Sequence, residues 1–320
     1  MRPAVYIPNF NGAARLGGVL RALGEQTAAA DVVLVDNGSG DGSVELARRE
    51  LPGVRVVELG ENLGFGRAIN RAVAEVPGDP VVLLNNDAVP EPRFVEALLD
   101  GLGEGVNSVA GVLLQERLPE LIDSGGVVAD RTLMGFDYLH GEPVAAAQAA
   151  AAPLGPTGGA ALYRRAAFEA VGGFDERIFL YYEDLDLALR LAANSSRCRL
   201  APEARALHAY SASLGAASAR KYAWTGWSRG YMLRRYGVMQ NPRLALRALA
   251  CEGALCAAQL LRDHTAAGFR GRLGGWRDAA GLSSRDADGA ALLDLSVREA
   301  LALRRRRRVM SPSPAIGWTT

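Results

Sequence analysis

Three acidic residues stand close together in the segment FLYYEDLDLALR, where Glu183, Asp184 and Asp186 fall within four positions. The aromatic residues before them would exclude water, and both burial and neighbouring acids raise the pKa of a carboxyl group. A carboxyl group with a raised pKa is suited to act as a general base. The alternative is that these acids lie in water at the start of a helix. For Asp186 we favour that alternative, or a pairing with Arg190 in the same helix.

A second polar segment, VVLVDNGSGDGS, places Asp36 and Asn37 at the end of an apolar run and before a glycine-rich turn. A carboxylate in this position could accept a hydrogen bond from a nucleobase or a ribose, beside a flexible backbone that can approach the ligand. A turn that caps the next helix would explain the same residues equally well. The glycine spacing does not match the G-x-G-x-x-G pattern of dinucleotide-binding proteins.

A third segment, VVLLNNDAVPEP, ends another apolar run with Asn85, Asn86 and Asp87. A carboxylate at the edge of a sheet could hold a divalent cation that bridges a diphosphate. Ordinary turn formation, for which Asn and Asp are common, is the alternative. His208 in ALHAYS could be a metal ligand or a packed core residue.

Strands and helices that alternate along the chain must position these polar residues. Continuous apolar runs predict strands that are buried on both faces of a parallel sheet, at 4–7, 32–36, 54–59 and 81–85. Helical patterns lie between or after them, at about 13–26, 43–50, 65–75 and 92–102. This alternation predicts a three-layer α/β fold, in which ligands bind beyond the carboxyl ends of the strands.

The pattern becomes mixed from about residue 106. The segment TGGAALYRR at 157–165 predicts a strand entered through glycines, and 183–193 predicts a helix. The Ala-rich stretch 145–153 is either a short helix or a mobile loop. Beyond 215 the pattern is helical and Arg-rich, with helices expected at about 242–262 and 289–303.

The overall composition is that of a globular protein, since 49% of the residues are hydrophobic and 22% are charged. Disorder and collagen-like structure are therefore excluded. The net charge of +1 conceals two unlike parts. Residues 1–214 carry 18 Arg against 28 acids, whereas residues 215–320 carry 18 basic residues against seven acids. This asymmetry predicts different partners for the two parts.

Three cysteines without a CxxC pair give neither a disulfide framework nor a zinc site, and the first residues contain no apolar core of signal-peptide length. We therefore expect a cytoplasmic protein. The apolar stretch 243–262 is interrupted by Arg243, Arg247, Glu252 and Arg262. We expect it to lie on a membrane at most, and not to cross one.

Taken together, the order and spacing of these motifs resemble the family 2 glycosyltransferases with the GT-A fold, over roughly residues 3–214. The similarity is greatest to the bacterial, rhamnosyltransferase-like branch that acts in cell-wall and polysaccharide assembly. The matching segments are IPNFNG, VVLVDNGSGDGS, ENLGFGRAIN, LLNND in the place of the D-x-D motif, TGGAALYRRAAFEAVGGFDERIFLYYEDLDLALR, and His208 with Ser211.

The resemblance implies an α/β protein with the GT-A fold, a three-layer α/β/α sandwich followed by a C-terminal helical extension. Residues 1–214 would form the catalytic domain and residues 215–320 an Arg-rich helical region.

The resemblance also implies a role for each matching residue. Asp184 would be the catalytic base, with Glu183 beside it. Asp87 and His208 would hold Mn²⁺ or Mg²⁺, and Asp36 would contact the nucleobase. The residues expected to bind the nucleotide sugar are Pro8, Asn9, Asn11, Asp36, Asn62, Arg67, Asn85, Asn86, Gly158 and Gly159. Asn85 replaces the first acid of the D-x-D motif, which leaves strict dependence on the metal open.

The activity implied is inverting transfer of a sugar from a nucleoside-diphosphate sugar to an acceptor hydroxyl, which is a hexosyltransferase reaction. The donor would be dTDP-rhamnose, or a UDP- or GDP-sugar, and the acceptor a saccharide or a lipid-linked saccharide. The alternative is a non-catalytic nucleotide-sugar-binding or assembly subunit with the same fold.

The C-terminal third gives weaker signals. Residues 216–236 combine aromatic and basic side chains, and we favour packing of this helix against the catalytic domain. The helices that follow could bind an anionic membrane surface at the inner face of the cell membrane, form a homodimer interface, or cover the sheet. The run Arg304–Arg308 has no nucleic-acid recognition motif beside it, so we expect no nucleic-acid partner.

Overall fold

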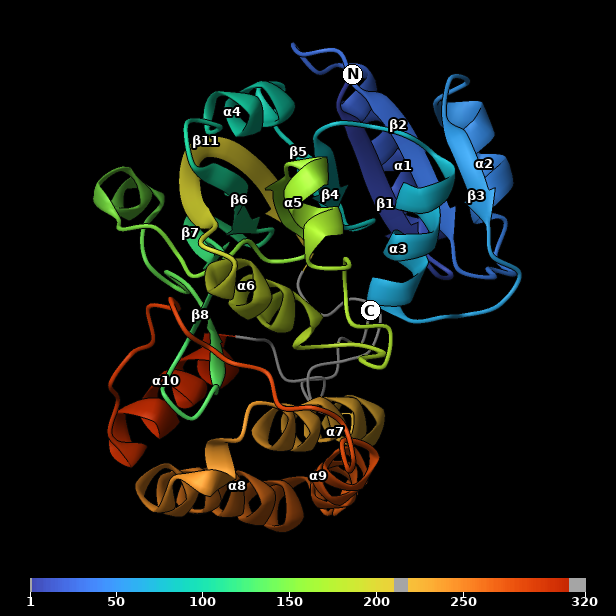
Figure 1. Cartoon of the computed structure of the whole chain (residues 1–320). Coiled ribbons are helices and arrows are strands. Elements are labelled where there is room, and N and C mark those ends of the chain that lie inside the picture. The colour runs from blue at the N-terminus through green and yellow to red at the C-terminus, as the bar shows by residue number, and fades with distance from the viewer. Residues whose placement is uncertain (1, 210–217, 311–320) are drawn as a thin grey trace.

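A mixed sheet of nine strands forms the centre of the computed structural model, which describes residues 2–209 and 218–310. For residues 305–310 it describes the backbone alone. Three features of the sequence lie outside the described residues: Ser211, the expected boundary between residues 214 and 215, and the tail 311–320. The side chains of Arg305–Arg308 are also not described. The strand order is β3-β2-β1-β4-β10-β6-β11-β5, with β7 beside β6 (Figure 1).

The first half of the chain builds the parallel part of this sheet, as predicted. Its strands are β1 (Ala4–Asn9), β2 (Asp31–Asp36), β3 (Arg55–Glu58) and β4 (Val81–Leu84). The helices between and after them are α1 (Ala13–Gly24), α2 (Ser43–Glu50), α3 (Phe65–Glu75) and α4 (Phe94–Asp100). All four carboxyl ends of these strands therefore meet at one edge of the sheet.

The second half extends the sheet with strands of both directions. β10 (Ala160–Tyr163) runs antiparallel between β4 and β6 (Val106–Gln115). β11 (Arg197–His208) runs parallel to β6 and antiparallel to β5 (Ala88–Pro90), so that His208 lies opposite Ala88. β7 (Leu118–Ser124) pairs with β6, and β8 (Val127–Ala129) and β9 (Gly135–Asp137) form a separate hairpin. The Ala-rich stretch contains a short 3₁₀ helix, η1 (Val144–Ala149).

Helices cover both faces of the sheet and confirm the three layers. Alternate residues of β1 and β2 point to opposite faces, as the pleat requires. Val5 and Leu34 pack with α1, α2 and α4 in one buried cluster. Tyr6 and Val33 pack on the other face with α3, α5 (Arg165–Ala170) and α6 (Glu183–Ala193). The strands are thus buried on both sides, which explains their continuous apolar sequences.

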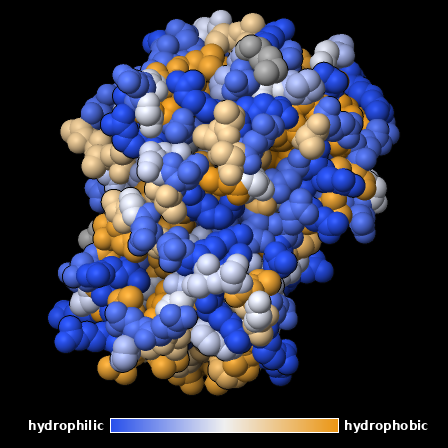
Figure 2. All heavy atoms as spheres, viewed as in Figure 1, coloured by the Kyte–Doolittle hydropathy of each residue, from blue (hydrophilic) through white to orange (hydrophobic). Residues whose placement is uncertain are grey.

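The C-terminal helices form a layer below α6 in Figure 1, comprising α7 (Ala219–Arg235), α8 (Pro242–Asp263), α9 (Ala267–Asp278) and α10 (Val297–Met310), with a 3₁₀ turn, η2 (Val238–Gln240). Tyr231 and Met232 of α7 share a buried cluster with Leu185 and Leu189 of α6. The prediction that this aromatic helix packs against the preceding part of the chain is confirmed. α8 lies on the outside, and hydrophobic residues gather along that edge (Figure 2).

Two predictions for this region were wrong. The helix expected at 289–303 begins only at Val297, because the residues before it form no regular element and Leu293 makes an isolated β-bridge with Asp130. α9 was not predicted, since glycine disfavours a helix. Here glycine allows two helices to touch: a Cβ at Gly275 would lie 1.8 Å from the carbonyl oxygen of Trp227. α7 and α9 therefore pack backbone to backbone.

Candidate active site

The carboxyl ends of β1, β2 and β4 are joined by a chain of polar side chains. Asn9 and Asp36 are register partners, and the amide of Asn9 donates to the Asp36 carboxylate over 3.3 Å. Asn86, just after β4, donates to the Asn9 side-chain oxygen at 2.7 Å. Gly12 completes this arrangement, because a Cβ there would lie 2.2 Å from the Asn86 amide nitrogen. Four predicted binding residues thus lie together: Pro8, Asn9, Asp36 and Asn86.

The turn after β2 fixes Asp36 in place. The backbone N–H of Ser39 donates to Asp36 at 3.0 Å, and the Ser39 hydroxyl accepts from the backbone N–H of Asn11 at 2.9 Å. Asp36 does not cap α2. That helix begins after Gly42, and it is Asp41 that accepts from the N–H of Ser43. The helix-capping interpretation is therefore wrong for Asp36, which is buried and directed along the strand ends.

The loop before α3 adds Asn62 to the same edge. The side chain of Asn37 accepts from the N–H of Leu63 and donates to the carbonyl of Gly64, so it ties this loop to β2. Asn62 in turn accepts from the N–H of Gly64 at 3.0 Å. Arg67 on α3 is half exposed and lies 3.7 Å from Glu176. Among the described contacts, none joins Arg67 to the other predicted residues.

His208 lies between two carboxylates at the edge of the sheet. Its Nδ1 is 2.6 Å from Asp123 on β7, and its Nε2 is 3.3 Å from Asp87. The Asn85 amide is 3.4 Å from the same Nε2. Burial alone would lower the pKa of His208, but its hydrogen bonds to Asp123 and Asp87 outweigh burial and raise the pKa to about 10. The His208 ring is largely buried, and it contacts the polar groups of Asp87, Asp123 and Asn85.

Asp123 and His140 were not predicted. His140 Nδ1 lies 2.7 Å from the carbonyl oxygen of Asp123 and 3.4 Å from its carboxylate. Burial would raise the pKa of Asp123, but hydrogen bonds from His140 and His208 hold it well below the usual range. Because Asp123 stands 85 residues before His208 in the chain and outside any motif, only the pairing of β7 with β6 reveals their contact.

The donor atoms of Asp87 and His208 suit a divalent cation. Asp123 binds Nδ1 of His208 and so directs Nε2 towards Asp87, which is the arrangement that orients metal-ligating histidines in proteins. The Asp87 carboxylate suits Mn²⁺ or Mg²⁺, and a histidine nitrogen favours Mn²⁺. His208 would bind a cation only through a deprotonated Nε2, so the cation would have to displace the proton that the raised pKa of His208 retains. Within the described residues, no cluster of three or more His, Cys, Asp or Glu side chains could hold a metal ion. The protein would therefore supply only part of a coordination shell.

Glu183 and Asp184 begin α6, directly after two strained residues. Tyr181 and Tyr182 both have positive φ, at 68° and 71°, a conformation that costs energy for residues other than glycine and is common at functional sites. Asp184 accepts from the backbone N–H of Leu185, and its other oxygen is 3.5 Å from the Thr157 hydroxyl. The strained turn thus presents the two carboxyl groups at the first turn of the helix.

Both carboxyl groups are buried, and burial raises their pKa values above those of ordinary acidic side chains. It raises the pKa of Asp184 to about 6, with repulsion from Asp137 adding to it. Burial and the charge of Asp184 raise the pKa of Glu183 well above its usual range. One oxygen of Glu183 has no hydrogen-bond partner within the described residues. At neutral pH, Asp184 is the member of the pair that can accept a proton.

Gly158 and Gly159 connect this acid to the strand ends. A Cβ at Gly158 would lie 2.7 Å from the Phe65 ring, and one at Gly159 would lie 2.9 Å from the Asn85 amide. The backbone N–H of Asn85 donates to the carbonyl of Gly159 at 3.2 Å. A side chain at either position would force the Phe65 ring or the Asn85 amide to move, so glycine allows the loop to lie close to both.

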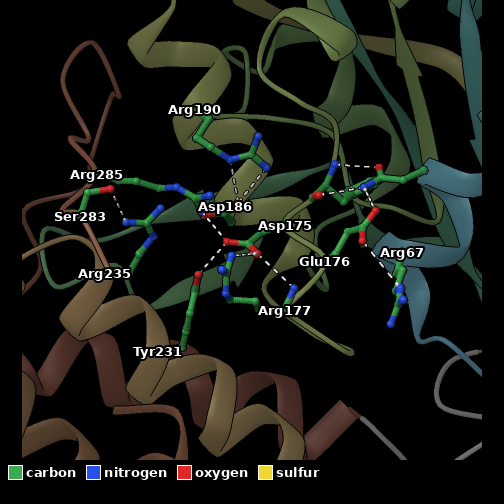
Figure 3. A network of polar contacts seen from close by, with 12 residues as sticks. Arg67, Asp175, Glu176, Arg177, Asp186, Arg190, Tyr231, Arg235, Ser283 and Arg285 are labelled. Carbon is green, nitrogen blue, oxygen red and sulfur yellow. Dashed lines mark hydrogen bonds and ion pairs between the residues drawn. The ribbon is translucent and has the colours of Figure 1, made fainter. Parts of the chain in front are cut away.

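Asp186 belongs to a buried network rather than to the site (Figure 3). It pairs with Arg190 at 2.8 Å, as predicted, but it is fully buried, so the interpretation that it lies in water is wrong. Arg285 bridges Asp186 and Asp175 at 2.6 and 2.8 Å. Tyr231 of α7 donates to Asp175 at 2.7 Å. This network holds the helix that carries Asp184 to the C-terminal layer.

Comparison with known sequences gives, among others, three matches. The sequence model of the family described as Glycosyl transferase family 2 matches residues 4–172. The chain is 34% identical over 205 residues to the N-acetylglucosaminyl-diphospho-decaprenol L-rhamnosyltransferase of Mycobacterium tuberculosis, covering 55% of this chain and 66% of that protein. It is 31% identical over 195 residues to the succinoglycan biosynthesis protein ExoA of Rhizobium meliloti, covering 58% and 57%. The chain thus spans just under two thirds of the length of the first relative.

Two solved structures are also similar. The mannosyltransferase PcManGT from Pyrobaculum calidifontis, in complex with GDP-Man and Mn²⁺, has a TM-score of 0.52 at 19% identity, covering 88% of this chain and 87% of that one. GalNAc-T7 with UDP, GalNAc and Mn²⁺ has a TM-score of 0.60 at 13% identity, covering 89% and 55%. Similarity at this level of identity establishes the fold alone, and it confirms the expected α/β GT-A architecture.

Proposed function

The chain belongs to glycosyl transferase family 2, and from this premise we propose that it transfers a sugar, with inversion, from a nucleoside-diphosphate sugar to an acceptor hydroxyl. The observation that carries this proposal is the position of Asp184. A carboxyl group with a raised pKa stands on a strained helix start, next to the Gly158–Gly159 loop that reaches the ends of the strands. A protein that only binds nucleotide sugars needs no such base, which favours an enzyme.

Donor binding is assigned to the chain of side chains at the edge of the sheet. Asp36 would accept from the nucleobase, with Asn9, Asn11 and Asn62 completing that side of the pocket. Asn85 and Asn86 would face the ribose. Gly158 and Gly159 would let the sugar approach the backbone. Arg67, which pairs with Glu176 across the loop, would have to leave that contact to reach the base.

The chemical step follows from the same residues. Asp184 would take the proton from the acceptor hydroxyl as that oxygen attacks the anomeric carbon, while the bond to the nucleoside diphosphate breaks on the opposite face. Thr157 lies within reach of the carboxylate and would orient it. Asp87 and His208 would hold Mn²⁺ or Mg²⁺, and such a cation offsets the charge that develops on the leaving diphosphate.

The names of two relatives suggest which donor and acceptor to propose. The rhamnosyltransferase relative is named for a diphospho-decaprenol acceptor, and ExoA is named for succinoglycan biosynthesis. We therefore propose dTDP-rhamnose as the first donor to test, before UDP- and GDP-sugars, and a saccharide carried on a lipid diphosphate as the acceptor. A lipid-linked acceptor would place the protein in the cytoplasm at the inner face of the membrane. The acidic part, residues 1–214, would carry the chemistry, and residues 215–320 would serve location or assembly.

A thermal-shift panel tests donor binding. The full chain is melted with dTDP-rhamnose, UDP-sugars and GDP-sugars, each with and without Mn²⁺, because a ligand that binds the native state raises Tm. We expect one nucleotide class to raise Tm, and Mn²⁺ to increase the shift in the wild type but not in Asp87→Asn. If no nucleotide sugar raises Tm at any concentration, the proposed function is wrong.

A further inference from the structure

α8 differs from an ordinary surface helix: the charged residues in its middle face the protein, and four of its leucines are exposed. Arg247 pairs with the fully buried Asp130 at 3.1 Å. Glu252 is buried and pairs with Arg229 at 2.5 Å and with Arg272 at 2.6 Å. A surface helix of a globular protein normally buries its apolar stripe and exposes its charges. The charges in the middle of α8 are therefore used inside the protein.

The outward side of α8 is an unbroken apolar stripe. Its exposed residues recur at helical spacing, namely Leu246, Leu249, Ala250, Gly253, Ala254, Ala257, Leu260 and Leu261. Leu246 and Leu261 are 73% and 75% exposed. Exposed Phe269 and Leu273 lie one helical turn apart on α9. Figure 2 shows that hydrophobic residues gather along the lower edge of the molecule, where Figure 1 places α8. We call α8 with these two residues of α9 the apolar face.

This face is rimmed by positive charge. Arg243 and Arg262 stand near the two ends of the α8 stripe, and Arg270 and Arg277 stand on α9. All four are exposed, and none of them forms an ion pair within the described residues. A second copy of this chain would bring the same four positive charges against this rim. An anionic lipid surface offers both the apolar interior for the leucines and the negative charge for the arginines.

By length and composition, α8 could cross a membrane, and it is the one such helix among the described residues. Only 17% of its most apolar stretch is buried in the protein. The ion pairs of Arg247 and Glu252 hold its inner side to the protein, so crossing would break them and carry both charges into lipid. The helix therefore fits a position parallel to the surface, with its leucines in the lipid and its charged side on the protein.

We propose that the apolar face docks the protein on an anionic membrane, with α8 lying in the interface plane. Its purpose rests on the proposed function, because docking would bring the active site to a lipid-linked acceptor. The binding itself does not depend on that function. Full-length protein is therefore mixed, without donor or acceptor, with phosphatidylcholine vesicles that contain or lack phosphatidylglycerol, and vesicle-bound protein is measured by flotation.

We expect wild-type protein to float with phosphatidylglycerol vesicles and to bind more weakly at high salt. Leu246→Glu and Leu261→Glu should each weaken binding at least about tenfold, since each replaces a leucine in lipid by a charge. Both positions are exposed, so the folded state should persist, which circular dichroism would verify. Leu118→Glu on β7 is the matched control, and its binding should equal that of the wild type.

Three results would overturn the proposal. The first is no flotation of wild-type protein with anionic vesicles at low salt. The second is equal binding by wild type and the Leu246→Glu/Leu261→Glu double variant. The third is a dimer in analytical ultracentrifugation that the double variant converts to a monomer, which would assign the face to a second copy. A chain that binds vesicles normally but transfers no sugar would instead refute the proposed function and leave the docking inference intact.

Discussion

Glu183 and Asp184 are adjacent in sequence but differ in what they can do. Both are carboxyl groups with raised pKa values, and burial is the first cause for each. Burial and the charge of Asp184 raise the pKa of Glu183 well above its usual range, and one Glu183 oxygen lacks a hydrogen bond within the described residues. Asp184 receives the Leu185 N–H and can ionise. When two neighbouring acids lie in different environments, their pKa values differ, and one can act as an acid and the other as a base.

Replacing the base should stop transfer without disturbing the donor site. In Asp184→Asn, kcat should fall by about 10³-fold or more, because a general base contributes about 10²–10⁴-fold. The Kd for the nucleoside diphosphate should stay within about twofold, since among the described residues no hydrogen bond joins Asp184 to Asp36 or Asn9. Product formation and calorimetric titration measure the two quantities.

Glu183→Gln is the matched control, because it makes the same change from carboxyl to amide at the neighbouring residue, whose raised pKa favours the neutral form. It should keep most of the activity. Near-normal turnover in Asp184→Asn together with a dead Glu183→Gln would move the base to Glu183.

The raised pKa of Asp184 also sets a pH dependence. A base must be deprotonated, and the folded-state value of about 6 lies above that of an ordinary aspartate. Activity should therefore be full above that pH and fall about tenfold per unit below it. A profile of kcat/KM against pH gives the midpoint. A profile that stays flat down to the ordinary aspartate range would show that Asp184 does not act as the base.

The sequence predicted most residues at the strand ends because strand, turn and polar residue follow each other locally. Asn9, Asp36 and Asn86 lie together as expected. Asp123 could not be predicted, because its contact with His208 depends on the pairing of strands far apart in the chain. The burial of Asp186 was missed for the same reason: its partner Arg285 lies 99 residues away.

At the scale of elements, α6 connects the chemistry to the rest of the protein. Its first turn carries Glu183, Asp184 and Asp186. Asp186 joins the network with Asp175 and Arg285 (Figure 3). Hydrogen bonds from Tyr231 and Arg285 hold the pKa of Asp175 below its usual range, although burial opposes them. The position of the base therefore depends on contacts made by the C-terminal layer.

Removing the bridging cation should destabilise the whole protein. Arg285→Gln leaves two buried carboxylates short of a partner, and breaking such a pair costs about 3 kcal/mol. Urea denaturation should show that decrease in the free energy of unfolding. Arg177→Gln is the control: Arg177 lies 3.9 Å from the same Asp175 but is 57% exposed, so its removal should have little effect. Equal losses in both variants would contradict the account of this network.

The elements themselves were predictable to different degrees. The parallel strands and the helices between them follow from clear apolar periods. α9 was missed because its glycines argue against a helix when read locally. They are explained only by the close crossing with α7, where a Cβ at Gly230 would lie 2.0 Å from the Arg272 carbonyl oxygen. Tertiary packing overrides local preference there.

At the scale of the molecule, the opposite charges of the two parts acquire a structural meaning. Asp130, Asp175 and Asp186 of the acidic part are buried against Arg247 and Arg285 of the basic part. Part of the asymmetry is thus neutralised inside the protein. Four further exposed arginines, Arg243, Arg262, Arg270 and Arg277, stand on the two helices of the apolar face. The division at residues 214 and 215 stays a prediction, and the shared cluster of α6 and α7 shows that the described parts pack together.

The central claim is that this chain transfers a sugar through Asp184, and a direct product assay tests it. Wild-type and Asp184→Asn proteins are incubated with dTDP-rhamnose, Mn²⁺ and a saccharide linked to a lipid diphosphate, and the product is identified by mass and by NMR of its anomeric centre. We predict one added sugar with inverted anomeric configuration in the wild type and none in the variant. Transfer with retained configuration, or equal product from both proteins, would contradict the account.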